Sequence, residues 1–176
     1  VGVDFFVVVT ATFRILYVLV IVSHERRRVV YFNVTSSPSA QWTAQQVVQA
    51  FPFDMAPRFL IRDHDSIYGA FLRKRIGDLG IEEVLTAYRS PWQNPYCERW
   101  IGTARRDCLD HVIIWNEAHL RRTLHEFLSY YHADRTHQGL ANDCPESRPV
   151  EPRSVGRVVE LPRVGGLHHR YTRLAA

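Results

Sequence analysis

The sequence predicts an α/β fold built on a mixed sheet of five strands. Apolar runs of strand length occupy residues 1–10, 13–22 and 28–34, with short turn segments between them, which predicts an antiparallel meander. Helical patterns then alternate with short apolar strands, as in α/β proteins. The chain has 176 residues, of which 46% are hydrophobic and 23% are charged, so it can bury the core of one globular domain.

Helix and strand signals alternate after the meander. Ser39 suits a helix cap and precedes apolar residues at helical spacing, so a helix is expected over residues 39–50. The segment RFLI at 58–61 predicts a short buried strand. A helix over 66–79 and a strand over 82–86 follow. These strands complete a mixed five-stranded sheet that is flanked by helices.

Two more helices are expected before residue 145. Asn94 and Pro95 suit the cap and the first turn of a helix that runs to about residue 109. Another helix starts near Asn116, because apolar residues follow it at helical spacing: Leu120, Leu124, Phe127, Leu128 and Tyr131.

The composition changes near residue 145. Residues 1–145 form the expected core, and residues 146–176 are rich in Pro, Gly and Arg, which predicts a small basic C-terminal tail, with short strands as one alternative. The net charge of +4 lies wholly beyond residue 147, where 6 arginines face 2 acids. Such a tail suits a polyanion. Biased codon usage in a GC-rich genome would give the same preference for arginine, and this alternative stays open.

Several classes of protein are disfavoured. The cysteines Cys97, Cys108 and Cys144 include no Cys-x-x-Cys pair, so neither a disulfide framework nor a thiolate zinc site is expected, and a reducing cytoplasm fits. The apolar run over 5–22 contains Arg14, whose insertion into a membrane would cost about 2.5 to 3.5 kcal/mol, so buried strands are favoured. The chain begins without Met inside an apolar run, which indicates a fragment that lacks its N-terminal part.

Two aspartates are candidates for chemistry at the strands. Asp4 is the only charge among the first thirteen residues, and a carboxylate buried in a strand needs a partner or a metal. A solvent-facing strand end is the alternative. Asp63 follows the strand FLIR, and Asp65 stands two positions later, on the same face of an extended chain. Asp65 suits the cap of the next helix, which leaves Asp63 free for chemistry.

Glu98 is the third candidate. Gly102 and Arg105 share its helix face at i+4 and i+7, which places a carboxylate, a clear space and a cation in one row. A solvated glutamate on an amphipathic helix is the alternative. The combination of one acid on the first strand, one after the fourth strand and one on a later helix favours a functional set.

The stretches YRSPWQNPYCERWIGTARRDCLDH and HLRRTLHEFLSYYHADRTHQGL closely resemble the integrase core of bacterial insertion-sequence transposases, which are relatives of retroviral integrases. The resemblance implies a ribonuclease H-like fold and an acidic triad of Asp4, Asp63 and Glu98. Subtracting 63 from 98 gives 35 positions, as this family requires, whereas Asp65 would give 33. His64 and Asp65 depart from the Asn and Gly that often stand there in the family.

The resemblance implies metal-dependent cleavage and transfer of DNA strands, as in transposition and DNA integration. Asp4, Asp63 and Glu98 would hold two Mg²⁺ or Mn²⁺ ions. The expected partners are the element ends and target DNA, with a homo-oligomer on the DNA and no membrane, in the bacterial cytoplasm at the nucleoid. A nuclease without strand transfer and an inactive remnant that only binds DNA are the alternatives. The expected DNA contacts are Gln93, Asn94, Arg105, Arg106, Arg163, Arg170 and Arg173, although helix capping is favoured for Asn94.

Overall fold

The computed structural model describes residues 1–52 and 55–175, and it contains the mixed five-stranded sheet that the sequence predicts. The strand order is β3-β2-β1-β4-β5. The first three strands form the expected antiparallel meander, and the last two run parallel to β1. The strands are β1 (Gly2–Val9), β2 (Ile15–Val22), β3 (Val29–Thr35), β4 (Phe59–Arg62) and β5 (Glu82–Leu85).

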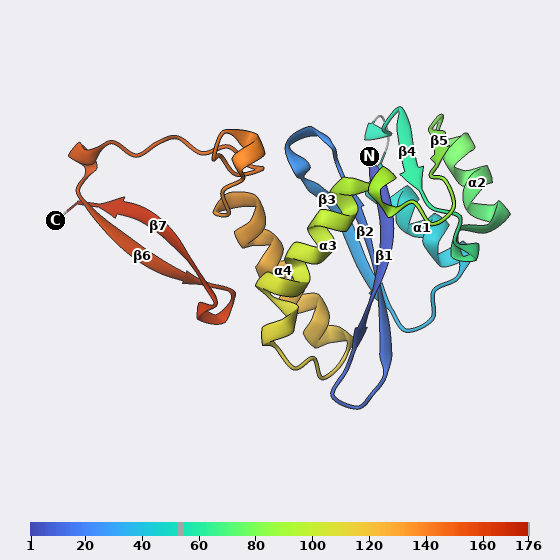
Figure 1. Cartoon of the computed structure of the whole chain (residues 1–176), viewed down its shortest axis with the longest axis horizontal. Coiled ribbons are helices and arrows are strands. Elements are labelled where there is room, and N and C mark those ends of the chain that lie inside the picture. Colours follow the sequence, from blue (N-terminus) through green and yellow to red (C-terminus); the bar gives the residue numbers. More distant parts are fainter. Residues whose placement is uncertain (53–54, 176) are drawn as a thin grey trace.

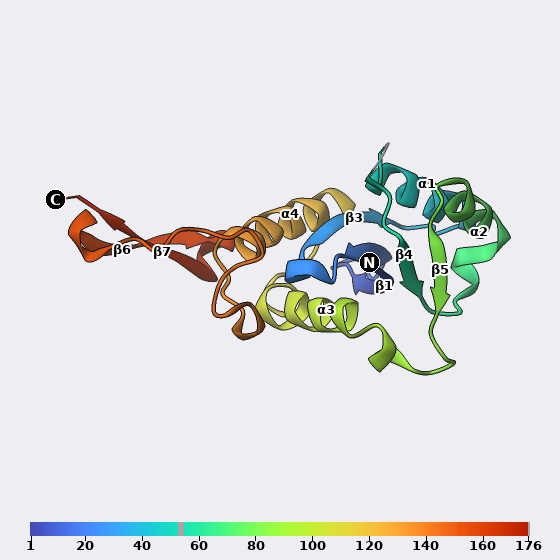
Figure 2. The ribbon, with the colours of Figure 1, turned by 90° about the horizontal axis from the view of Figure 1, so that it is seen from above.

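Helices cover both faces of the sheet (Figures 1 and 2). One face packs against α1 (Ala40–Ala50) and α2 (Gly69–Asp78), and the other against α3 (Pro95–Asp107) and α4 (Glu117–Ala133). Side chains alternate along a strand, so β2 sends even-numbered residues such as Val18 to the α3–α4 core and odd-numbered residues such as Leu19 to the α1–α2 core. The ribonuclease H-like arrangement is therefore confirmed.

Local signals explain the ends of two helices. The Ser39 hydroxyl accepts a hydrogen bond from the backbone N–H of Trp42 at 3.1 Å, which confirms the expected cap of α1. The helix expected over 66–79 begins instead as a 3₁₀ turn at Ser66–Tyr68 and becomes α2 at Gly69. Gly69 has a φ of +37°, a value that interrupts helical geometry and that favours glycine.

The C-terminal residues form a second, two-stranded sheet. Strands β6 (Arg157–Arg163) and β7 (His168–Leu174) pair antiparallel, and the hairpin projects beyond α4, away from the large sheet (Figures 1 and 2). The division of the chain at residue 145 stays a prediction. Among the described residues, no helix combines the length and the apolar character that crossing a membrane requires.

Asp134 joins the hairpin to the end of α4. Its side chain is only 2% exposed, and its oxygens accept hydrogen bonds from Arg163 Nε at 2.8 Å and Arg170 Nη1 at 3.2 Å. The ring of His168 also stacks on Tyr130, with 4.3 Å between the centroids. Arg163 and Arg170, which the sequence analysis assigned to DNA, therefore have partners inside the chain.

Replacing Asp134 should release the hairpin. In Asp134→Asn the two arginines lose their anionic partner, so we expect the free energy of unfolding to fall by about 1 to 3 kcal/mol. We also expect trypsin to cut faster within β6 and β7. Urea unfolding and timed proteolysis measure the two effects.

Asp110→Asn is the matched control, because Asp110 is exposed and has no salt bridge among the residues that the structure describes. Equal proteolysis rates for the two variants would show that Asp134 does not hold the hairpin.

Candidate active site

An acidic cleft of about 320 Å³ lies where β1, β4 and α3 approach one another. Asp4, Asp63, Asp65 and Glu98 line it, and the loop that leads from β5 to α3 forms the opposite wall. The structure therefore brings the three members of the expected triad to one cleft. They come from the first strand, from the residue after the fourth strand and from the first turn of a later helix.

The parallel pairing of β4 with β1 places the two aspartates. Gly2 is paired with Ile61, so two further residues along each strand bring Asp4 level with Asp63. Asp4 also lies on the same strand face as Phe6, which packs against α3 in the core. Asp4 therefore faces the helix that carries Glu98.

Asn94 holds α3 close to β1. Its side chain is 4% exposed, and its Nδ2 donates a hydrogen bond to the carbonyl of Val3 at 3.1 Å. A Cβ atom at Gly2 would lie 2.3 Å from the Asn94 Oδ1, so only glycine allows this approach. Asn94 occupies the cap position but makes no side-chain capping bond. The expected capping role is therefore wrong, because the tertiary contact with β1 uses the side chain.

Asp63 and Asp65 have different local roles. The Asp65 Oδ1 accepts a hydrogen bond from the N–H of Ile67 at 2.9 Å, which confirms its expected capping role at the 3₁₀ turn. The N–H of Asp65 donates to the Asp63 Oδ1 at 3.2 Å. Behind them, the buried Arg62 donates to the Asp63 carbonyl at 2.6 Å and pairs with Glu83 at 2.7 Å. The Asp63 backbone is therefore anchored, while its side chain is exposed to the cleft.

Burial and like charge disfavour the ionised form of Asp4. Desolvation raises the pKa of its carboxyl to about 7, and the charges of Glu98, Asp63 and Asp65 act in the same direction. The N–H of Phe5, which donates to Asp4 Oδ1 at 2.7 Å, offsets part of this effect. Among the described residues, no Arg or Lys forms a salt bridge with Asp4, Asp63 or Glu98. The three carboxylates therefore have no salt-bridge partner within these residues, although Arg89 also lines the cleft.

This donor set suits a hard divalent cation. Carboxylate oxygens are its preferred ligands, and Mg²⁺ binds through one or two carboxylates together with waters and substrate phosphates. Within residues 1–52 and 55–175, no group of three or more His, Cys, Asp and Glu side chains is already close enough to hold a metal ion. The three carboxylates therefore do not form a closed all-protein metal site in the part of the chain that the structure describes.

Two aromatic residues on the cleft were not identified from the sequence. His64 and Tyr88 stack with 4.1 Å between centroids and an interplanar angle of 16°. His64 follows β4 and Tyr88 follows β5. The two residues are 24 positions apart in the sequence, so no local pattern indicates the pair. Arg62 was missed for a similar reason, because an arginine in a strand carries no signal that it is buried.

The other expected DNA contacts lie in several places. The Gln93 side chain accepts a hydrogen bond from the N–H of Ala87 at 2.6 Å and so braces the loop beside the cleft. Arg105 donates to the Val7 carbonyl at 3.0 Å, along the same side of α3 as Glu98. Arg106 lines a different cavity, described below. Arg173 donates to the Gly156 carbonyl at 2.9 Å, within the hairpin region.

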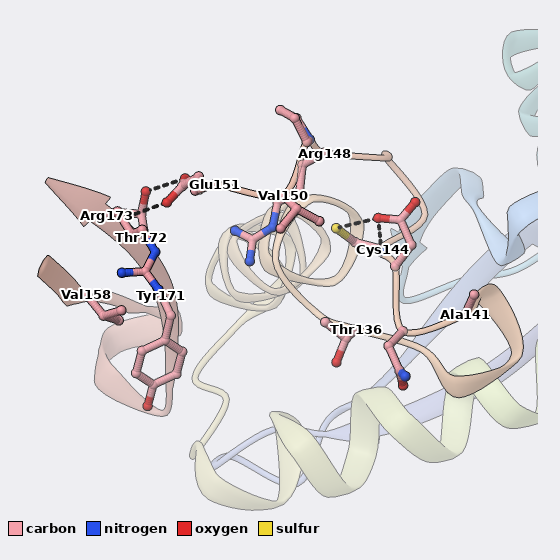
Figure 3. Close-up of a pocket in the computed structure, with 13 residues that line it drawn as sticks. Thr136, Ala141, Cys144, Arg148, Val150, Glu151, Val158, Tyr171, Thr172 and Arg173 are labelled. Carbon is pink, nitrogen blue, oxygen red and sulfur yellow. Dashed lines mark hydrogen bonds between the residues drawn. The ribbon is translucent and has the colours of Figure 1, made fainter. Parts of the chain in front are cut away.

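Another cavity, of about 490 Å³, lies between the hairpin and residues 136–151 (Figure 3). Its polar groups largely satisfy one another: Glu151 accepts hydrogen bonds from Thr172 Oγ1 and from the N–H of Arg173. The Asp143 carboxylate, which pairs with Arg26 at 2.6 Å, has a pKa below its usual range because Ser147 and Arg26 donate hydrogen bonds to it. This cavity therefore offers no free set of acids or nucleophiles.

Comparisons with known proteins concern the sequence family and the fold. Residues 79–145 match the family described as integrase core domain. The fold is similar to the catalytic core domain of BIV integrase, with a TM-score of 0.52 and 17% identity over 82% of this chain and 90% of that one. It is also similar to a chain of the simian T-cell lymphotropic virus intasome, with a TM-score of 0.65 and 14% identity.

The similarity to the intasome chain covers 97% of this chain, and this chain spans 64% of the length of the intasome chain. No curated protein matches the sequence. The match over residues 79–145 includes Glu98 and the loop that walls the cleft, and the whole five-stranded sheet has the fold of an integrase catalytic core. Residues 79–145 are therefore similar to the integrase core family, and the chain shares the fold of the two solved structures.

Proposed function

We propose that this chain is the catalytic core of a bacterial insertion-sequence transposase that cleaves a DNA strand and joins it to another. One observation carries the proposal. Asp4, Asp63 and Glu98 line a single cleft, come from separate elements and have no cationic partner among the described residues. Carboxylates grouped in this way repel one another when they are ionised. Bound cations would remove this repulsion, so the arrangement suits a site that binds cations.

We assign Asp4, Asp63 and Glu98 as the ligands of two Mg²⁺ or Mn²⁺ ions. Such ions would activate the attacking water or 3′ hydroxyl and stabilise the leaving oxygen. The chain itself orients the ligands. Central strand β1 fixes Asp4, while Arg62 and the N–H of Asp65 hold Asp63 from behind. Asn94 keeps the first turn of α3, and with it Glu98, against β1.

The proposed partners are the ends of a mobile element and its target DNA, on which copies of the chain would assemble in the bacterial cytoplasm. Arg105 is the best placed contact for a DNA phosphate, because it lies two helical turns from Glu98 on the same side of α3. Arg163, Arg170 and Arg173 stay proposed contacts, although each already has a partner within the chain.

A metal-dependent assay on DNA with the element's own ends separates the candidate functions. Joined products formed in Mg²⁺ or Mn²⁺ and lost in EDTA would support the transposase. Cleaved but never joined strands would indicate a nuclease of the same fold. Binding without any cleavage would indicate an inactive remnant.

The two neighbouring aspartates should differ in their effect on cleavage. Asp63→Asn should abolish metal-dependent cleavage with little change in stability, because it removes a ligand that is exposed to the cleft. Asp65→Asn should retain cleavage, because its side chain caps the 3₁₀ turn, and should change the free energy of unfolding by about 1 kcal/mol or less.

Both variants carry the same change in charge and chemistry, so each is the control for the other. Nicking of labelled DNA and urea unfolding give the two readouts. Equal losses of cleavage at positions 63 and 65 would contradict the assignment of Asp63 as the ligand.

The raised pKa of Asp4 predicts a pH-dependent effect on stability without metal. In the unfolded chain the Asp4 carboxyl has the ordinary pKa of 3.8, while in the folded chain burial raises its pKa to about 7. Between these two pKa values the folded chain holds a proton on Asp4 that the unfolded chain has released. The free energy of unfolding therefore falls as the pH rises through this range, and the fall is complete above about pH 7. Asn cannot ionise. The stability of Asp4→Asn relative to the unsubstituted chain should therefore be greater at pH 8 than at pH 5.

Urea unfolding in EDTA at the two pH values measures this difference. Asp110→Asn, at an exposed position, should show no such change. An Asp4→Asn effect that is the same at both pH values would show that the Asp4 carboxyl titrates normally.

A further inference from the structure

A large basic cavity lies along α3, apart from the acidic cleft. Its volume is about 810 Å³, and four arginines line it: Arg27, Arg99, Arg106 and Arg135. No Asp or Glu is among the residues that line it. The acidic cleft and the basic cavity share no lining residue.

Helical geometry separates the two sites. Arg99, Thr103 and Arg106 stand at spacings of four and three, so they share one stripe of α3 and line the cavity together. Glu98 lies about 100° around the helix from Arg99, on the stripe that continues to Arg105. The sequence analysis expected Arg106 to contact DNA, and the structure places Arg106 on this second cavity.

Most of the positive charge in the cavity is uncompensated. Arg135 pairs with Asp107 at 3.1 Å. Within the described part of the chain, Arg27, Arg99 and Arg106 form no salt bridge. The Arg27 guanidinium lies beside Gly139, where a Cβ atom would lie 2.0 Å from Nη2. Guanidinium groups held in one cavity repel one another unless an anion binds between them.

Two buried side-chain nitrogens of residues that line the cavity have no hydrogen-bond partner among the described residues: Trp100 Nε1 and His137 Nε2. The Trp100 side chain is 1% exposed, and its Nε1 can only donate. A buried donor without a partner is costly, so an acceptor beside Trp100 would be favoured.

We propose that this cavity binds a backbone phosphate of DNA away from the strand that reacts, through Arg99, Arg106 and Arg27. The inference rests on the proposed function for the identity of the anion as DNA. Guanidinium groups bind phosphate through paired N–H donors, and the indole N–H of Trp100, which also lines the cavity, is a further neutral donor. A DNA duplex that crosses α3 would reach both sites. The acidic cleft would cleave one strand, and the basic cavity would hold the duplex in position.

The cavity extends toward the start of α3. A smaller pocket of about 170 Å³ shares Arg27, Tyr96 and Arg99 with it and adds Pro95, the first residue of the helix. Glu98 belongs to the same first turn, on the neighbouring stripe. The basic cavity and the small pocket therefore reach the first turn of α3, the turn that also carries Glu98.

The first test uses inorganic phosphate and needs neither DNA nor activity. The indole N–H resonance of Trp100 is one of four in the ¹H–¹⁵N spectrum, and it is identified by elimination with Trp42→Phe, Trp92→Phe and Trp115→Phe. We expect phosphate to shift this resonance saturably in the unsubstituted chain. The shift should disappear in the double variant Arg99→Gln/Arg106→Gln, whose two side chains are exposed at the surface.

The second test measures the affinity for a short non-specific duplex as a function of salt. The logarithmic salt slope should fall by about 0.9 for each phosphate contact that Arg99→Gln/Arg106→Gln removes. Arg14→Gln/Arg122→Gln is the control with the same change in charge, because both side chains are exposed and neither lines the cavity. The control should keep the slope of the unsubstituted chain.

Both effects together support the inference. The absence of a Trp100 shift overturns it, and so does a phosphate shift with an unchanged salt slope, which would indicate a site for free anions only. The proposed function is judged separately by metal-dependent cleavage in Asp63→Asn and the unsubstituted chain. A protein that binds DNA through the cavity but never cuts would refute the proposed chemistry and leave the phosphate site standing.

Discussion

The parallel pairing of β4 with β1 is the constraint on which the candidate active site depends. Asp4 and Asp63 are far apart in sequence, and only the register that pairs Gly2 with Ile61 brings them to the same level of the sheet. The pairing is short. It is reinforced by the N-terminal ammonium of Val1, which donates to the Phe59 carbonyl at 2.9 Å, and by the N–H of Ile61, which donates to the Val1 carbonyl at 2.9 Å.

The contact of α3 with β1 completes the site by the same logic. Asn94 is bonded to Val3, the residue before Asp4, so one buried side chain sets the distance between the strand that carries Asp4 and the helix that carries Glu98. Gly2 makes this contact possible, because any side chain there would collide with Asn94. The carboxylates are thus brought together against their mutual repulsion by the packing and the hydrogen bonds around them.

The distribution of charge gives the two sides of α3 different chemistry. Residues 1–147 hold equal numbers of acidic and basic residues, so their net charge suggests no binding surface. In space these charges separate into an acidic cleft on the Glu98 side of α3 and a basic cavity on the Arg99 side. The C-terminal arginines, which carry the whole net charge, are in part neutralised by Asp134. The net charge of the chain therefore does not show where its charged side chains gather in space.

The sequence by itself determined the order and the approximate limits of the strands and helices, the caps at Ser39 and Asp65 and the 35-position spacing between Asp63 and Glu98. These features depend on neighbours within a few positions, so local patterns carry them. Only the tertiary structure decided that the Asn94 side chain donates a hydrogen bond to the Val3 carbonyl. It also decided that Arg106 lines the basic cavity together with Arg27 and Arg99. Those contacts depend on how closely α3 packs on the sheet and on which elements surround it, and no spacing along the chain encodes that.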